Sequence, residues 1–276
     1  MKARPDQAWR RAQRAGWRWA AAGVLLGLAL GTLVFAPAAW LAGAVNEASG
    51  GRALLADAQG TLWSGSAVAV LTGGPGSRDA SALPGRLHWR LAPRWNGLRL
   101  ALEQACCLSA GLTLNLHPRW QGLAVELPAR EPAAELGRWP AAALAGLGTP
   151  WNTMQLGGQL RLFSSGFTLQ WAAGRATLGG GLDLELREAA SRLAPVDPLG
   201  SYRLSLRNAA NHDSGTAILL STIDGALRLS GSGQWSGSAL KFRGEASAAP
   251  GQEAALANLI NIIGRRQGAQ AVLTIG

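Results

Sequence analysis

From residue 87 onward, the chain repeats a short pattern in which apolar and polar residues alternate. In residues 87–91 and 98–102, Leu or Trp occupies every second position, and His or Arg stands among the residues between them. A period of two is typical of a strand with one buried face. The same alternation returns at 112–116, 123–127, 160–162, 167–171, 182–186, 202–206, 227–229 and 240–242, which predicts at least ten strands.

Clusters of turn-forming residues separate these segments. Gly, Pro, Asn and Ser gather at positions 73–76, 96–97, 164–166 and 179–181, and such clusters are typical of turns between strands. The connections are too short for helical crossovers, so neighbouring strands are expected to run antiparallel. The chain is therefore predicted to be mainly β, with a curved, mostly antiparallel, meandering sheet that has one apolar face.

Two segments depart from the alternation. Residues 129–149, rich in Ala and Pro, predict either a short helix around Pro140 to Leu147 or an irregular excursion. In residues 250–266, a Pro and an acidic first turn precede apolar residues at helical spacing, and Gly264 with two arginines follows, which predicts a C-terminal α-helix. A final strand over 271–275 is expected to return to the sheet.

The N-terminal region is organised differently. No charged residue lies between Arg18 and Glu47, and residues 19–41 are almost wholly Ala, Leu, Val, Gly, Phe and Trp. About 20 such residues in a helix cross the roughly 30 Å apolar core of a bilayer. We therefore expect a transmembrane helix over residues 20–41, with tryptophans at its ends in the position of an interfacial belt.

The distribution of charge orients this helix. The formal net charge is +10, and residues 1–19 contain six basic residues against one acidic residue. Because positive segments stay on the cytoplasmic side, we expect a cytoplasmic tail over 1–19 and an exported β-rich domain over 42–276. The remainder of the chain has no run of five or six like charges, which argues against nucleic acid as a partner.

The apolar run permits a second interpretation. Small residues at 36–38 and 42–44 resemble the sites that signal peptidase cleaves, so the run could belong to a cleaved signal peptide. The run is longer than the roughly 7–15 residues usual for the core of a signal peptide. An uncleaved signal anchor is therefore the preferred interpretation.

Histidine and cysteine, which often carry site chemistry, are sparse. The three histidines have no partner carboxylate at metal-ligand spacing: His88, His117 and His212. Cys106 and Cys107 are adjacent, so they cannot link distant segments, although an exported domain permits disulfides. Reduced or mutually paired structural cysteines are the preferred interpretation, and an intermolecular disulfide or a redox role is the alternative.

No other group of residues suggests an enzyme. The glycines at 179–181 lack the Lys and Ser or Thr of a phosphate-binding loop and are interpreted as turn residues. Asp183 and Glu185 alternate with leucines, so they are expected to face solvent beside Arg187 rather than to form an acid–base pair. We predict no enzymatic activity, no cofactor and no metal.

Tryptophan is the unusual part of the composition, with 12 Trp against one Tyr and four Phe. Four stand at strand-like positions, where an indole packs in a core or lines an apolar surface for lipid or protein: Trp63, Trp89, Trp171 and Trp235. Two short segments also recur. Pro-Arg-Trp-Asn-Gly-Leu at 93–98 returns as Pro-Arg-Trp-Gln-Gly-Leu at 118–123, and Trp-Ser-Gly-Ser at 63–66 returns at 235–238, which fits a sheet with similar hairpins stacked along one groove.

The order of these features resembles the type II secretion system protein N family (general secretion pathway protein N) of Gram-negative bacteria. A basic tail and one transmembrane helix precede Gly60-Thr61-Leu62-Trp63-Ser64-Gly65, and a strand with Trp89 and Pro93 follows. The strand at 221–225 and the helix over 254–266 also resemble the family. The candidate residues are those of the family motif, with two groove candidates added: Gly60, Thr61, Trp63, Gly65, Trp89, Pro93, Trp171 and Trp235.

The resemblance implies a protein of the bacterial inner membrane with its N-terminus in the cytoplasm and its β-rich domain in the periplasm. It implies an accessory, non-catalytic component of the inner-membrane platform, supporting export of folded proteins across the outer membrane. The expected partners are other platform proteins, contacted through sheet edges or the transmembrane helix.

A second resemblance offers an alternative function. A curved sheet with one apolar face, attached to the inner membrane, is similar to the AsmA-like bridge proteins, which implies a lipid-binding or lipid-transfer module with an apolar β groove. An open apolar trough would favour this function. A trough filled by the C-terminal helix or by the protein's own side chains would not.

Overall fold

The computed structural model describes residues 6–108, 111–120, 122–129, 133–172, 175–208, 215–236 and 239–276. Its strands form one 16-stranded sheet, and the paired neighbours run antiparallel, as predicted. The strands are β1 (Ala53–Gly60), β2 (Ser64–Thr72), β3 (Ala80–Ala82), β4 (Leu87–Arg94), β5 (Gly97–Glu103), β6 (Leu112–Arg119), β7 (Gly122–Leu127), β8 (Ala134–Pro140), β9 (Leu156–Ala172), β10 (Arg175–Ser191), β11 (Gly200–Asn208), β12 (Thr216–Gly225), β13 (Leu227–Trp235), β14 (Leu240–Ala248), β15 (Arg265–Gln267) and β16 (Gln270–Ile275).

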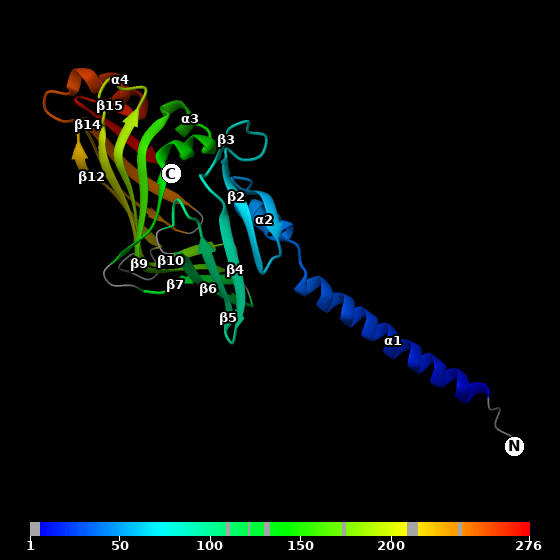
Figure 1. Ribbon diagram of the computed structural model, residues 1–276. Helices are drawn as coiled ribbons and strands as arrows, with labels where there is room; N and C mark the ends of the chain where they lie inside the picture. The colour runs from blue at the N-terminus through cyan, green and yellow to red at the C-terminus, as the bar shows by residue number, and fades with distance from the viewer. Residues whose placement is uncertain are drawn as a thin grey trace.

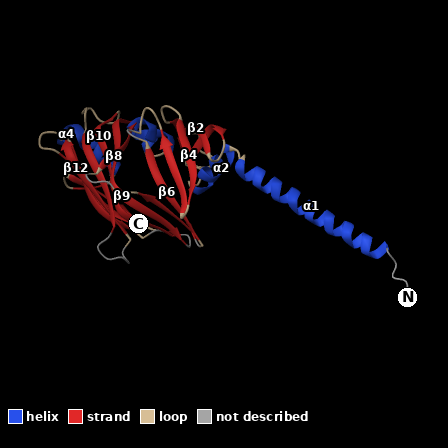
Figure 2. Cartoon of the chain, turned by 60° about the horizontal axis from the view of Figure 1, so that its bottom comes forward, coloured by secondary structure: helices blue, strands red, loops and turns tan. Residues whose placement is uncertain are grey.

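The helices lie at the N-terminus and over parts of the sheet. They are α1 (Asp6–Val34), α2 (Ala38–Ala48), the 3₁₀ helix η1 (Ala141–Leu147), α3 (Trp151–Met154) and α4 (Glu253–Ile263). Figure 1 shows a strongly curved sheet with α1 extending away from it, and Figure 2 shows the same separation from another direction. The segment 129–149, left open between a helix and an irregular excursion, contains both β8 and η1.

The range expected for one transmembrane helix, 20–41, falls on two helices. Helix α1 ends at Val34 and α2 begins at Ala38, with Pro37 as its N-cap residue. Proline has no backbone N–H and disfavours helical geometry in the residue before it, so the helix stops ahead of Pro37. In the described part of the chain, no helix combines the length and the hydropathy that a membrane span requires.

The two longest strands contain the glycine clusters that we interpreted as turns, and that interpretation is wrong. Positions 164–166 lie inside β9 and positions 179–181 inside β10, where Gly181 pairs with Gly166. The register shifts beside this pair, which marks a β-bulge. Gly166 and Gly180 have positive φ angles of 120° and 85°. These glycines therefore allow a bend within a long strand and do not form a turn between strands.

The length of β9 follows from its two partners on one side. Its second half pairs with β7, through Gly122–Leu127, and its first half pairs with β8, through Ala134–Pro140. Strand β9 therefore pairs first with β8 and then with β7, and the bulge at Gly166 lies between the two paired regions.

The register gives the sheet an apolar and a polar face, as the alternation predicted. Leu162, Leu184, Leu204 and Leu220 pair in turn across β9 to β12, and the face that they share is called the leucine face. On the other face, called the polar face, the neighbouring row across the same strands is Arg161, Glu185, Arg203 and Ser221.

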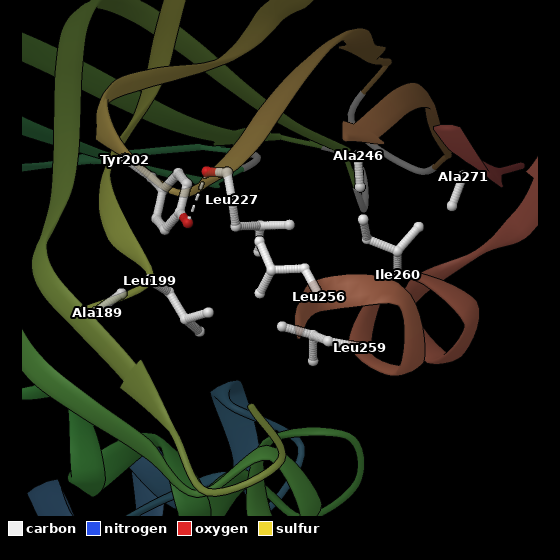
Figure 3. Close-up of a cluster of buried hydrophobic side chains, with 9 residues drawn as sticks. All are labelled: Ala189, Leu199, Tyr202, Leu227, Ala246, Leu256, Leu259, Ile260 and Ala271. Atoms are coloured by element: carbon white, nitrogen blue, oxygen red, sulfur yellow. Dashed lines mark hydrogen bonds between the residues drawn. The ribbon is translucent and has the colours of Figure 1, made fainter. Parts of the chain in front are cut away.

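The C-terminal helix covers one end of the leucine face. Leu256, Leu259 and Ile260 of α4 are buried against strand residues, among them Tyr202 and Leu227. The hydroxyl of Tyr202 donates a hydrogen bond to the Leu227 carbonyl at 3.0 Å (Figure 3). The predicted C-terminal helix and final strand are confirmed as α4 and β16, and helix α4 fills this part of the sheet's apolar surface.

Candidate functional site

Five of the eight candidate residues meet where the N-terminal helices join the sheet. We call this region the helix junction and define it as Ala36, Pro37, residues 60–65 and Trp89. The residues 60–65 span the turn between β1 and β2, and Trp89 lies on the adjacent strand β4. The candidates in the junction are Gly60, Thr61, Trp63, Gly65 and Trp89.

The turn of the helix junction depends on Gly60 and Thr61. Gly60 has a φ of +89°, and a Cβ there would lie 2.6 Å from the carbonyl oxygen of Ser64. The Thr61 backbone N–H donates to that oxygen at 2.9 Å, and the Ser64 N–H donates to the Thr61 hydroxyl at 3.1 Å. Glycine supplies the left-handed conformation without steric cost, and the threonine closes the turn.

Trp89 lies under this turn. Its indole is only 3% exposed, and its Nε1–H donates to the carbonyls of Leu62 at 3.1 Å and Thr61 at 3.3 Å. A Cβ on Gly65 would lie 2.5 Å from the indole carbon Cζ2. Gly65 therefore leaves the space that the indole occupies, and the indole satisfies two carbonyls of the turn.

The same turn contacts the end of α1 and the link to α2. Trp63 donates from Nε1 to the Leu33 carbonyl at 2.8 Å, and Leu62 donates its N–H to the Ala36 carbonyl at 2.8 Å. Pro37 forms an isolated β-bridge with Thr61. The last carbonyls of a helix have no partner within it, so the bond from Trp63 supplies one of the missing donors.

Small residues complete the junction, and the sequence interpretation missed their role. Ala36 is 0% and Ala38 1% exposed, and Ala38 packs with Ala67 and Trp89 in a small core. These alanines belong to the segment 36–38 that resembles a cleavage site. Side chains of this size let α2 approach the sheet closely.

The other three candidates lie elsewhere. Pro93 is exposed near the end of β4, Trp171 is 53% exposed at the end of β9, and Trp235 is half-buried at the end of β13. The structure does not bring them to the helix junction. Two tryptophans that were not among the candidates, Trp95 and Trp120, are fully exposed at 104% and 100% in hairpin turns. Their turns are the two similar hairpins predicted from the repeated segment.

Two acidic residues of β10, Asp183 and Glu185, form ion pairs on the polar face. Glu185 accepts from Arg203 at 2.7 Å and from Arg187 at 2.8 Å, and only 5% of its side chain is exposed. Burial would raise the pKa of Glu185, but these hydrogen bonds and charges lower it below its ordinary value. The expectation that Glu185 faces solvent is wrong, because the two arginines cover it.

Asp183 is held in the same way. Arg207 donates to it at 2.6 Å and the Ser205 hydroxyl at 2.6 Å. Partial burial works to raise the pKa of Asp183, and the bonds from Arg207 and Ser205 outweigh it and lower the pKa. Carboxylates paired this firmly remain ionised, so neither residue is suited to take up a proton as a general base near neutral pH.

Histidines and cysteines do not assemble a metal site in the described residues. His117 has a partner carboxylate after all, with Nε2 at 3.3 Å from Glu126 Oε2 across β6 and β7, while His88 is exposed and His212 lies outside the described residues. Cys106 and Cys107 form a disulfide with each other, which agrees with the mutually paired interpretation.

A shallow hollow of about 990 Å³ lies on the polar face of the C-terminal strands. Its lining combines the charged residues Arg207, Lys241 and Arg243 with Ser, Thr and Gln side chains and with the apolar residues Ala217, Ile218, Leu219, Phe242 and Ile275. This mixed lining differs from the wholly apolar trough expected for an acyl chain.

Comparison with protein families matches residues 52–274 to the family described as Type II secretion system (T2SS), protein N. The matched range begins just before β1 and reaches into β16, so it covers nearly the whole sheet together with α4. It includes the turn and Trp89 of the helix junction. Comparisons with curated proteins and with solved structures gave no match.

Proposed function

The chain belongs to the type II secretion system protein N family, and we propose that it is an accessory, non-catalytic component of the inner-membrane platform of that system. In this role it supports the export of folded proteins across the outer membrane and binds other platform proteins. Family membership carries the secretion role. The helix junction is the observation that supports a domain held beside a membrane helix.

The membrane attachment is assigned to the apolar part of α1, between Arg18 and Val34, because α2 packs against the sheet. Helix α1 is 29 residues long, or about 43 Å, and its part after Arg18 is about 24 Å long. Its apolar side chains are exposed in every direction, for example Val24, Leu25 and Leu26 at 61%, 67% and 62%. A helix that presents apolar side chains all round fits an apolar surrounding. The basic residues that precede the apolar run favour a tail at 1–19 in the cytoplasm and a domain at 42–276 in the periplasm.

The contacts of the segment 36–38 support an anchor that is retained. Cleavage there would cut the link whose Ala36 carbonyl bonds to Leu62 and whose Ala38 is buried in the small core. The second segment that resembles a cleavage site, 42–44, lies within α2. The contacts of the helix junction therefore favour a chain in which α1 stays joined to the sheet over one that is cleaved.

A non-catalytic role agrees with the state of the most chemically suggestive residues. Asp183 and Glu185 of β10 are engaged by arginines, and the vicinal cysteines are joined to each other. Partner contacts would then be made by the sheet edges at β1 and β15 or by α1.

The secretion role is tested in a deletion strain. Secretion of the system's native substrates is expected to stop when the gene is removed and to return with the full chain. Photocrosslinking from exposed positions of β1 and β15 should capture platform proteins. Normal secretion without the gene, together with no captured platform protein, would refute the proposal. Trp63→Phe, which removes the indole N–H and part of the ring, is compared with the parent chain.

The topology is tested separately. In spheroplasts, added protease is expected to digest the β domain, while the protein stays in the membrane pellet after alkaline extraction. A protein that is released by alkali, or protected from protease until the cells are lysed, would contradict the assigned anchor or orientation.

The lipid-transfer alternative retains one supporting observation. Between α2 and α4, leucines of the leucine face such as Leu114, Leu169 and Leu184 are only half-buried. Two others weigh against it, because α4 fills one end of that face and the hollow lies on the polar face. The alternative is tested by mass spectrometry of the lipid that copurifies with the full chain, with a chain carrying only α1 as the control. More lipid bound to the full chain than to this control would favour the alternative.

A further inference from the structure

Two hairpin turns present a bare tryptophan at the same end of the sheet. Trp95 lies between β4 and β5, where Arg94 pairs with Gly97, and Trp120 lies between β6 and β7, where Arg119 pairs with Gly122. Both indoles are fully exposed. We call these two turns the tryptophan tips. Tryptophan is costly to leave in water, so two equivalent bare indoles point to a binding surface.

The surroundings of the tips are apolar and basic. Beside the second tip, Leu123 pairs with Trp171, and their side chains are 40% and 53% exposed. The charged residues of the tip segments 92–99 and 117–120 are arginines, with His117 the one further titratable residue. Glu126, the nearest carboxylate along β7, lies four positions after Gly122, the first residue of that strand, and is engaged by His117.

The tips point toward the end of the sheet that holds α1. Ser64, directly after the β1–β2 turn, pairs with Arg90, so β4 runs past this turn toward Trp95. That turn is the one that bonds Leu33 at the end of α1. Figure 1 shows the β4–β5 hairpin at the bottom of the sheet and α1 leaving from its right side.

We propose that the tryptophan tips bind the surface of an anionic phospholipid bilayer. Indoles prefer the headgroup region, where the ring is in an apolar setting and the N–H is in a polar one, and the adjacent arginines meet the negative surface. This inference rests on the proposed function for the membrane that α1 enters. It adds that the β domain lies against that membrane and is held at two further points.

The test uses the full chain in vesicles of phosphatidylethanolamine and phosphatidylglycerol. An environment-sensitive fluorophore is attached at Asn96→Cys in the first tip, and in a second protein at Arg78→Cys, an exposed loop position at the opposite end of β2. The Cys106–Cys107 disulfide is kept intact during labelling. Flotation reports whether the chain stays on the vesicles, and nitroxide-labelled lipid reports whether each fluorophore meets the bilayer.

Lipid quenching is expected at position 96 and not at position 78. Replacing both indoles, Trp95→Ser with Trp120→Ser, should abolish it. Each of Arg94→Gln and Arg119→Gln should lower the docking equilibrium constant about fivefold, an effect absent from phosphatidylcholine vesicles. Because both indoles are fully exposed, these variants leave the fold intact, which circular dichroism checks.

The failures are distinguishable. A chain that floats without quenching at position 96 refutes the tip contact and leaves the anchor in place. A chain that does not float refutes the anchor and the tips together. Shielding of position 96 only after platform proteins are added means that the tips bind protein, and this also overturns the inference.

Discussion

Trp89→Phe tests whether the helix junction is built as described. The substitution keeps an aromatic ring but removes the Nε1–H that two carbonyls of the β1–β2 turn accept, at 3.1 and 3.3 Å. Because Trp89 is 3% exposed, water does not readily replace this donor. An unsatisfied buried carbonyl costs about 1–3 kcal/mol, and the lost ring volume adds to it, so we expect a loss of about 2–4 kcal/mol.

The measurement is thermal unfolding of the full chain in detergent, followed by circular dichroism. For a chain of this size, 1 kcal/mol moves Tm by roughly 2–4 °C, so Tm should fall by about 5–15 °C. Trp95→Phe is the matched control, because that indole is fully exposed, and it should remain within about 0.5 kcal/mol of the parent. Equal stability of the two variants would refute the role given to the Trp89 indole.

Three further predictions concern packing and pH. Gly65→Ala should lower the free energy of unfolding, measured by chemical denaturation, by about 1–3 kcal/mol, because its Cβ would lie 2.5 Å from the Trp89 ring. Gly179→Ala, whose Cβ would have ordinary van der Waals spacing, is the control. Equal losses of stability in the two variants would contradict the packing. Glu185→Gln should lower Tm at neutral pH, with the difference vanishing as pH falls below the ordinary carboxyl value of 4.5, since the folded pKa is lowered; a pH-independent difference would disprove the pairing. Burial, with a smaller effect of a nearby aspartate, raises the pKa of Tyr202, the single tyrosine. Its tyrosinate absorbance should therefore appear only as the protein unfolds above about pH 10, and ionisation of the folded protein near that pH would refute the burial.

The two faces of the strands and the antiparallel order of neighbours followed from the sequence because their signal is local. Alternating leucines around Leu184 and Leu204 decided which face of each strand is apolar, and the short connections decided that neighbours are antiparallel. The burial of an individual side chain could not be predicted from this alternation. Glu185 has the parity of the polar face, but its burial comes from arginines on its own strand and on β11, and no local pattern reports that.

Glycine clusters carried an ambiguous signal. A positive φ is needed both in a tight turn and in a bulge inside a strand, so the residues around Gly166 and Gly180 were compatible with either. The junction was only partly predictable for a related reason. The motif at 60–65 was recognised, but its partners Leu33 and Ala36 lie far away in sequence, and small residues near an apolar run also look like a cleavage site.

The exposed tips show what the repeated segment did and did not reveal. Pro-Arg-Trp-x-Gly predicted two alike hairpins because Gly97 and Gly122 end the turns. That the indoles remain bare depends on the absence of any covering segment among the described residues, which is a tertiary property.

The central claim, that the β domain works in secretion while attached to the inner membrane by α1, is tested most directly by detaching it. Residues 1–35 are replaced with a cleavable signal peptide, so that the domain from Ala36 onward is released into the periplasm, and secretion is measured in the deletion strain. We predict that the released domain is present at normal levels but does not restore secretion. Full secretion with the detached domain would contradict the account.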